Sequence, residues 1–354
     1  MRALDPIRLR AWIDDRAAQD LFSGVSLVRS GDDVLFEHAA GLAHRGHRVP
    51  VTAGTKFQVA SVTKMITAAT ALRLVERGTL SLHRPLTASL PPEHRPAGLD
   101  DRHTLHHLLS HTSGLADYHD DEDDTWASFT GAWDRVPVYK ARGPEDILPL
   151  FADLPATDDP GEFAYADANY ILTGLLIEWV TGRSFADVAT EEVLHPSGMG
   201  DSGFYQLDLE PENMATAYLV TDESPEMLRS NIYSVPAGGM PDAGLTTTAA
   251  DLARFLDSIG SGSILSPETV SSMLTLHGLD DDSLEGYGYG MELVVVDGVV
   301  TIFGHAGAGP GVSAMVSHYV DDRVTVIVLC NRDRGSWGVA QRIAEALDLT
   351  DPRE

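Results

Sequence analysis

Ser61 and Lys64 have the types and the spacing of a nucleophile and its base. They stand three positions apart in Ser61-Val62-Thr63-Lys64, at the start of an apolar helical run. Because residues i and i+3 lie on one face of a helix, we expect the Lys64 amine to reach the Ser61 hydroxyl. The apolar neighbours would partly desolvate the amine, which disfavours its charged form and makes it a usable base near neutral pH. The pair therefore predicts acyl transfer through a serine nucleophile.

Two further blocks carry groups suited to such a reaction. Residues 160–170 hold Tyr165, Asp167 and Asn169 in a Gly/Pro-bounded turn that leads into an apolar helical run. Residues 304–311 read Gly-His-Ala-Gly-Ala-Gly-Pro-Gly and follow the β-rich stretch 291–303. Glycines there would let a substrate approach the backbone closely. The three blocks predict a site assembled from distant parts of the chain.

Three shorter segments accompany these blocks, namely residues 108–115 (LLSHTSGL), 195–199 (HPSGM) and 244–252 (GLTTTAADL). In this order and spacing, the six segments resemble the serine β-lactamase-like superfamily. The similarity is to its branch of class C β-lactamases, DD-peptidases, D-aminopeptidases and related esterases, and it spans most of the chain. A motif is a hypothesis that its context must support, and here the context is present.

The resemblance implies a role for each matching residue. Ser61 would be the nucleophile, Lys64 its base and Tyr165 a proton relay. The oxyanion hole would use the backbone N–H groups of Ser61 and Ala308. Four residues would contact the substrate: Asp167, Asn169, His305 and Gly307. We expect no metal and no cofactor.

Two positions depart from the pattern of the superfamily. His305 stands where penicillin-sensing enzymes usually place lysine, and an unperturbed histidine titrates near pH ~6.5. Any grip of His305 on a substrate carboxylate should therefore weaken above neutrality. Asp167 replaces the usual asparagine, and a carboxylate cannot donate to a substrate amide. The usual recognition of β-lactams is thus in doubt unless Asn169 substitutes.

Other kinds of site find less support. No serine has glycine at both minus two and plus two, so the G-x-S-x-G elbow of α/β-hydrolases is absent. His107 and His111 have the spacing of a helical metal pair, but no Glu lies between them as in H-E-x-x-H, which favours a structural role. The acidic run 117–124 lacks the Gly and terminal Glu of an EF-hand, so we interpret it as a solvated insertion. Cys330, the single cysteine, ends an apolar run and is expected to be buried and inert.

Composition indicates a globular enzyme with an acidic surface. The chain has 354 residues, of which 43% are hydrophobic, and its net charge of -28 comes from 53 acidic against 25 basic residues. This charge would repel nucleic acid and anionic membranes. Solubility is the favoured reason for it, ahead of salt tolerance or selection for cationic substrates. Residues 1–21 lack an apolar signal region, and no stretch reaches ~18 apolar residues, so we expect a cytoplasmic protein.

The pattern of elements predicts an α+β fold. We expect an antiparallel sheet built from both chain ends and flanked by helices, with an inserted all-helical lobe, as the resemblance also implies. The expected lobes are residues 1–60 with 241–354, and residues 61–240. Strands are predicted at 24–29, 34–40, 288–296, 299–303, 313–318 and 323–330. Helices are predicted at 7–19, 61–77, 105–109, 144–153, 168–181, 184–193, 249–258 and 337–347.

These observations predict a serine hydrolase that acts on a small ester or amide, of the esterase or D-amino-acid peptidase type. An acyltransferase using the same acyl-enzyme is one alternative, and a β-lactamase or DD-carboxypeptidase is another. A binding module without turnover is less favoured, because it has no chemical need for Ser61, Lys64 and Tyr165 together. Loops such as 116–142 and 210–238 would set the acyl and leaving groups. The sequence leaves these groups, and the oligomeric state, open.

Overall fold

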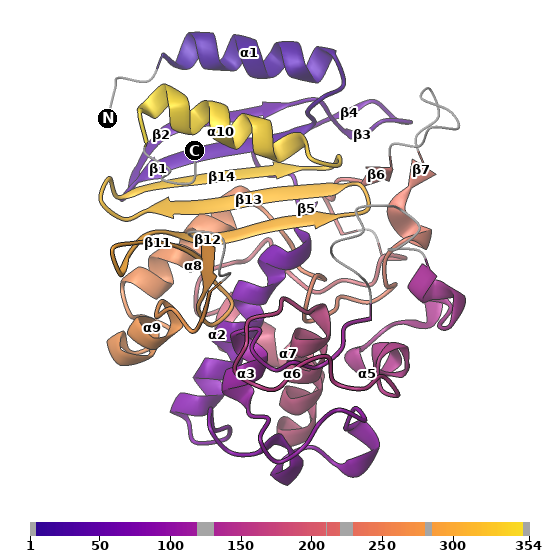
Figure 1. The fold of residues 1–354 in the computed structure, drawn as a ribbon. Helices are drawn as coiled ribbons and strands as arrows, with labels where there is room; N and C mark the ends of the chain where they lie inside the picture. Colours follow the sequence, from indigo (N-terminus) through magenta and orange to yellow (C-terminus); the bar gives the residue numbers. More distant parts are fainter. Residues whose placement is uncertain (1–4, 119–130, 210, 220–228, 280–284, 350–354) are drawn as a thin grey trace.

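The computed structural model describes residues 5–118, 131–209, 211–219, 229–279 and 285–349. Within them, the main sheet is antiparallel and has the strand order β2-β1-β14-β13-β12-β11-β10-β9 (Figure 1). An N-terminal hairpin of β1 (Gly24–Ser30) and β2 (Asp33–Ala40) pairs with the last strand through β1. The other strands are β9 (Gly278–Leu279), β10 (Glu285–Tyr287), β11 (Glu292–Val296), β12 (Val299–Gly309), β13 (Val312–Tyr319) and β14 (Val324–Cys330). The expected α+β fold, with a sheet made from both chain ends, is confirmed.

Two terminal helices cover one face of this sheet. They are α1 (Pro6–Ala18) and α10 (Gly335–Leu347), which lie together above the strands in Figure 1. Ile13 of α1 and Ile343 of α10 are fully buried in one cluster with Val28 of β1 and Cys330 of β14. Cys330 is thus a buried core residue, as its apolar run predicted.

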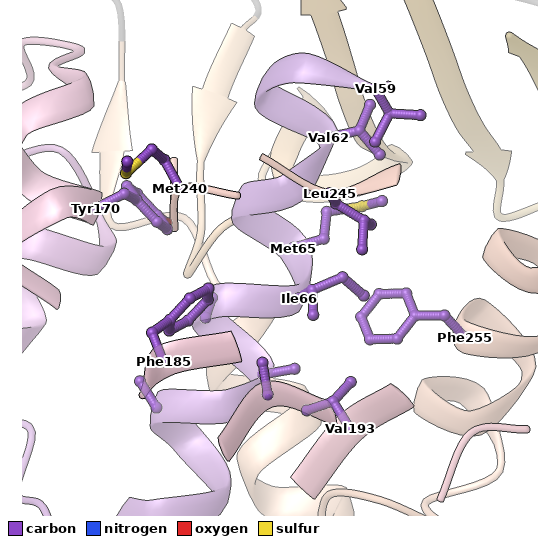
Figure 2. Close-up of a cluster of buried hydrophobic side chains, with 14 of the residues drawn as sticks. Val59, Val62, Met65, Ile66, Tyr170, Phe185, Val193, Met240, Leu245 and Phe255 are labelled. Atoms are coloured by element: carbon purple, nitrogen blue, oxygen red, sulfur yellow. The ribbon is translucent and has the colours of Figure 1, made fainter. Parts of the chain in front are cut away.

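Helix α2 (Thr63–Glu76) is the centre of the helical lobe on the other face. Figure 2 shows Met65 and Ile66 of α2 among side chains from several segments, including Phe255 and Val193. Such a helix, apolar around most of its circumference, is stable only when enclosed by others. The surrounding helices are α3 (Leu105–Leu109), α5 (Pro144–Ile147), α6 (Asp167–Thr181), α7 (Phe185–Ala189), α8 (Ala249–Gly260) and α9 (Pro267–Met273).

Short strand pairs complete the described part of the chain. They are β3 (Leu42–His44) with β4 (Val49–Pro50), β5 (Phe57–Gln58) with β8 (Thr246–Thr247), and β6 (Tyr218–Leu219) with β7 (Arg229–Ser230). None of the described helices is long and apolar enough to cross a membrane. The division into lobes at residues 60 and 241 stays a prediction.

Several expected elements have other bounds. The helix predicted at 144–153 ends at Ile147 and continues as a 3-10 turn over Leu148–Leu150, because Pro149 has no N–H to donate. The helix predicted at 184–193 becomes a π turn over Thr190–Leu194. The strand predicted from residue 288 starts only at Glu292, after the left-handed Gly290.

Two further differences between the predicted and the observed elements determine how the candidate site is built. Ser61 lies in a 3-10 turn, Ala60–Val62, and the α-helix begins after it at Thr63. Strand β12, predicted to end at residue 303, continues to Gly309. The motif around His305 is therefore part of the sheet and not a loop after it.

Candidate active site

A strained turn presents Ser61 beside the end of β12. Ala60 has φ +46°, in the left-handed region that a residue with a side chain rarely adopts. A Cβ at Gly307 would lie 2.2 Å from the carbonyl oxygen of Val59, so only glycine lets β12 approach this turn so closely. Ser61 and Ala308 consequently line the same cleft.

Lys64 is fully buried and contacts three groups. Its Nζ donates to the Ser61 Oγ at 2.9 Å and to the Asp242 carbonyl oxygen at 3.2 Å, and it forms an ion pair with the Asp167 carboxylate. Burial is the largest single effect and lowers the pKa of Lys64, but the charges of Asp167, Tyr165 and Asp242 together outweigh it, and the pKa lies well above its ordinary value. The expected contact with Ser61 is present. The expected neutral amine is wrong for this resting site, since spacing along a helix does not reveal a partner from residue 167.

Asp167 owes its position to the first turn of α6. The carboxylate of Asp117 accepts hydrogen bonds from the backbone N–H of Asp167 at 2.7 Å and of Ala168 at 3.0 Å. An acid placed in this way satisfies free N–H groups of the helix and interacts favourably with its dipole. Sequence reasoning placed Asp117 in a solvated acidic run and missed this role. Residues 119–124 of that run lie outside the described residues.

Asp242 is a second acid beside Lys64, and the sequence motifs did not reveal it. Its side chain is 2% exposed, and its Oδ2 accepts a hydrogen bond from the Tyr118 hydroxyl at 2.5 Å. Its Oδ1 is buried and has no hydrogen-bond partner within the part of the chain that the structure describes. Burial and the nearby charge of Asp167 raise the pKa of Asp242 to about 6.

The cavity beside Ser61, which we call the Ser61 cleft, opens to solvent. Trp133, Tyr205, Leu207 and Met240 contribute to its largely apolar and aromatic wall. Its charged lining consists of Asp167 and Asp242, and no Arg, Lys or His is among the described residues that line it. The cleft therefore has the apolar character of a small-molecule site, with an acidic end.

A sequence profile of the family described as Beta-lactamase matches residues 9–350. The chain belongs to the beta-lactamase family. It is 29% identical over 325 residues to "Penicillin-binding protein 4*" of Bacillus subtilis (strain 168), covering 88% of this chain and 68% of that protein. It is 32% identical over 300 residues to "Esterase EstB" of Burkholderia gladioli, covering 76% of this chain and 74% of that protein.

A solved structure agrees with this assignment. The crystal structure of a penicillin binding protein from Bacillus halodurans superposes with a TM-score of 0.86 and 32% sequence identity, covering 94% of this chain and 99% of that chain. This chain is thus a serine hydrolase of the beta-lactamase-like type, and the resemblance of its motifs is confirmed. The roles of its individual residues stay proposals.

A second cavity of this beta-lactamase-family chain lies beside Tyr165. The His305 cavity, as we call it, is lined by Tyr165, Tyr287, Glu292 and His305 among others. The ring centroid of Tyr165 lies 4.9 Å from the Lys64 Nζ and 4.1 Å from the ring of His111, on which it stacks. Tyr165 is therefore next to the proposed base, and it lines the His305 cavity.

His305 does not face the Ser61 cleft. Its side chain is 1% exposed, and its Nε2 lies 2.8 Å from the Tyr287 hydroxyl. Burial and the charge of Lys64 lower the pKa of His305 to about 3. The expectation that its charge titrates near neutrality is wrong, because His305 is neutral throughout the physiological range.

Asn169 does not take over the place of the missing asparagine. It is fully buried, its Oδ1 accepts from the Ser113 hydroxyl at 2.6 Å, and its Nδ2 lies 3.3 Å from the Nδ1 of His111. Asn169 thus holds the loop at residues 110–115 and does not line the cleft. Asp167, which stands where the superfamily usually has asparagine, does line the Ser61 cleft.

The histidines with metal-like spacing bond to the backbone instead. The Nδ1 of His107 accepts from the N–H of Thr104 at 3.2 Å, and the Nδ1 of His111 accepts from the N–H of Ala166 at 3.0 Å. Among the residues that the structure describes, no group of three His, Cys, Asp or Glu is arranged to hold a metal ion. His111 therefore connects the loop at 110–115 to the start of α6.

Proposed function

We propose that this chain forms an acyl-enzyme at Ser61 and hydrolyses a small ester or amide. The observation that carries the proposal is the 2.9 Å contact between the Lys64 Nζ and the Ser61 Oγ at the wall of an open cleft. A nucleophile and base within hydrogen-bond reach, with a third group orienting the base, is the arrangement such catalysis needs. The esterase among the relatives supports an ester as one substrate.

The first proton transfer must pass through the ion pair. An ammonium has no lone pair, so Lys64 accepts the Ser61 proton only after it has given one of its own protons to Asp167, which it contacts directly. The Ser61 oxygen then bonds to the substrate carbonyl carbon while its proton moves to the Lys64 amine. The leaving group departs with a proton, and water later cleaves the ester on Ser61, releasing the acid and restoring the hydroxyl.

Two further groups assist in this proposal. The backbone N–H groups of Ser61 and Ala308 would donate to the developing oxyanion, since both residues line the cleft. Tyr165 would deliver the proton to the leaving group, because its ring lies against the Lys64 ammonium. Asp167 would hold and exchange the Lys64 proton.

The test is the hydrolysis of a short-chain p-nitrophenyl ester by wild type, Ser61→Ala and Lys64→Ala, with intact-protein mass recorded during turnover. We expect a transient acyl mass on wild type only, and a loss of about 10³-fold or more in kcat/KM in both variants. Matched controls are Ser271→Ala on α9 and Lys140→Ala, whose side chains are exposed. Wild-type rates in Ser61→Ala and Lys64→Ala would contradict the proposal.

A further inference from the structure

The Ser61 cleft is lined by an aspartate with a buried carboxylate oxygen that has no hydrogen-bond partner among the described residues. Asp242 is 2% exposed, its Oδ2 accepts from Tyr118, and its Oδ1 accepts no hydrogen bond from the residues described. An unpaired buried polar group costs free energy, and native proteins rarely keep one without a reason. Because Asp242 lines the cleft, a bound substrate is a natural partner for it.

The charge around Asp242 indicates the sign of that partner. The positive charge of Lys64 is held by Asp167, and the described lining of the cleft includes no other cation. The rings of Tyr118, Trp133 and Tyr205 line the same space, and aromatic faces attract cations. A cationic group fits this end of the cleft, whereas a carboxylate would be repelled there.

The position of Asp242 indicates which part of the substrate it would meet. One nitrogen, the Lys64 Nζ, donates both to the Ser61 Oγ at 2.9 Å and to the Asp242 carbonyl oxygen at 3.2 Å. The main chain of Asp242 is thus two hydrogen bonds away from the proposed nucleophile. A group held by its side chain would therefore lie in the same cleft as the carbonyl carbon that Ser61 attacks.

We propose that Asp242 binds a protonated amine on the acyl group, so that the substrates are aminoacyl esters or amides. The ammonium would donate a hydrogen bond to the free Oδ1, while the Tyr118 hydroxyl keeps the Oδ2 in place. This inference rests on the proposed acyl-enzyme at Ser61 and adds the class of acyl group. Asp242 acts here on specificity and takes no part in the transfer of protons.

A pair of acyl groups of equal shape tests the inference. Alanyl and isobutyryl p-nitroanilides and ethyl esters differ only by an ammonium in place of a methyl group. Each kcat/KM is divided by the hydroxide-catalysed rate of the same compound, because an ammonium also activates the carbonyl. Both enantiomers of alanine are used. We expect wild type to prefer the better alanyl enantiomer by about 30-fold or more, which corresponds to one charge-assisted hydrogen bond.

Asp242→Asn should reduce this preference at least about 20-fold, because the amide has a similar shape and no charge. The matched control is Asp297→Asn, which makes the same change of net charge in the exposed turn between β11 and β12. Asp297 has φ +51°, which asparagine also tolerates, so this variant should keep the wild-type preference. An equal loss in both variants would assign the preference to overall charge and overturn the role of Asp242.

The two proposals fail in different ways. If neither ester leaves an acyl mass on Ser61, the acyl-enzyme is wrong. If the isobutyryl ester acylates Ser61 but wild type shows no preference for alanyl groups, only the inference about Asp242 is wrong.

If Asp242→Asn does not fold, a second experiment tests the inference: inhibition of wild type by 1-aminoethylboronic acid is compared with inhibition by isopropylboronic acid. We expect 1-aminoethylboronic acid to bind at least about 10-fold more tightly than isopropylboronic acid. Equal or weaker binding of the amino compound would overturn the inference.

Discussion

Lys64, beside the Ser61 cleft, and His305, in the His305 cavity, are two buried bases that differ in charge. In the cleft, Lys64 is fully buried and stays an ammonium because the Asp167 carboxylate beside it is only 9% exposed. In the cavity, His305 is equally buried and has a carboxylate, Glu292, 3.2 Å from its Nδ1, yet its pKa is lowered to about 3. The Glu292 side chain is 41% exposed, so solvent weakens its effect. Lys64 thus has a buried partner carboxylate and stays charged, whereas His305 has a half-exposed one and is neutral.

Replacing the buried partner should change the cleft most. In Asp167→Asn, the amide cannot take a proton from Lys64, so we expect kcat/KM for a p-nitrophenyl ester at pH 7 to fall about 100-fold. Asp153→Asn, at an exposed position, controls for the loss of one charge. Unchanged kcat/KM in Asp167→Asn would show that Lys64 loses its proton by another route.

Strand β12 forms part of both cavities, and its glycines test how closely it must approach the turn of Ser61. We expect Gly307→Ala to lower the free energy of unfolding by about 1–3 kcal/mol and kcat by about 10-fold or more, because its Cβ would meet the Val59 carbonyl oxygen at 2.2 Å. At Gly309 the nearest atom to a new Cβ is the Ala60 Cβ at 3.6 Å, an ordinary contact.

Urea unfolding and ester hydrolysis of Gly307→Ala and Gly309→Ala measure this difference. The loss of stability should be clearly larger for Gly307→Ala. Equal losses would mean that any side chain on this strand is harmful, and that the contact with Val59 is not what matters.

The neutral state of His305 has a consequence for stability at acidic pH. Its folded pKa of about 3 lies below the unfolded value of ~6.5, so the unfolded chain binds one more proton between these values. The contribution of the neutral His305 to the free energy of unfolding is fully present above pH ~6.5. It is lost as pH falls below that value, at about 1.4 kcal/mol per pH unit. His305→Gln removes the effect.

Denaturant unfolding of wild type and His305→Gln at pH 7 and pH 5 measures the contribution of His305 to the free energy of unfolding. The stability advantage of wild type should be about 2 kcal/mol smaller at pH 5 than at pH 7. An advantage that grows on acidification would mean that His305 is charged in the folded protein, and the contrast between the two cavities would disappear.

Local sequence signals predicted much of the fold. The strands at 24–29 and 34–40 and the helix at 249–258 were predicted, and in the structure the Thr248 side chain caps α8 by accepting from the N–H of Asp251. The full length of β12 was not predicted, since glycines are depleted in strands. Its ladder with β13, from Ile302 to Gly309, outweighs that local preference.

The sequence predicted which residues form much of the candidate site. It did not predict the protonation states of these residues. Ser61 and Lys64 are in contact because three positions along the chain suffice to bring them together. The charge of Lys64 depends on Asp167, and that of His305 on burial, which only the folded chain determines. Asp242 is a single acid in a loop and Asp117 begins an acidic run; neither belongs to a periodic pattern, so nothing in the sequence indicated their roles.

The pairing of β1 with β14 also determines when the sheet can form during synthesis. Gly24 pairs with Cys330, so the partner of the first strand is made near the end of translation. At ~5–20 residues per second, β1 waits about 15–60 s on the ribosome with one edge unpaired. Open strand edges promote aggregation, and pairings between distant residues form slowly. A nascent chain of this protein therefore depends on chaperones, or on its own helical lobe, to protect the N-terminal hairpin until β14 emerges.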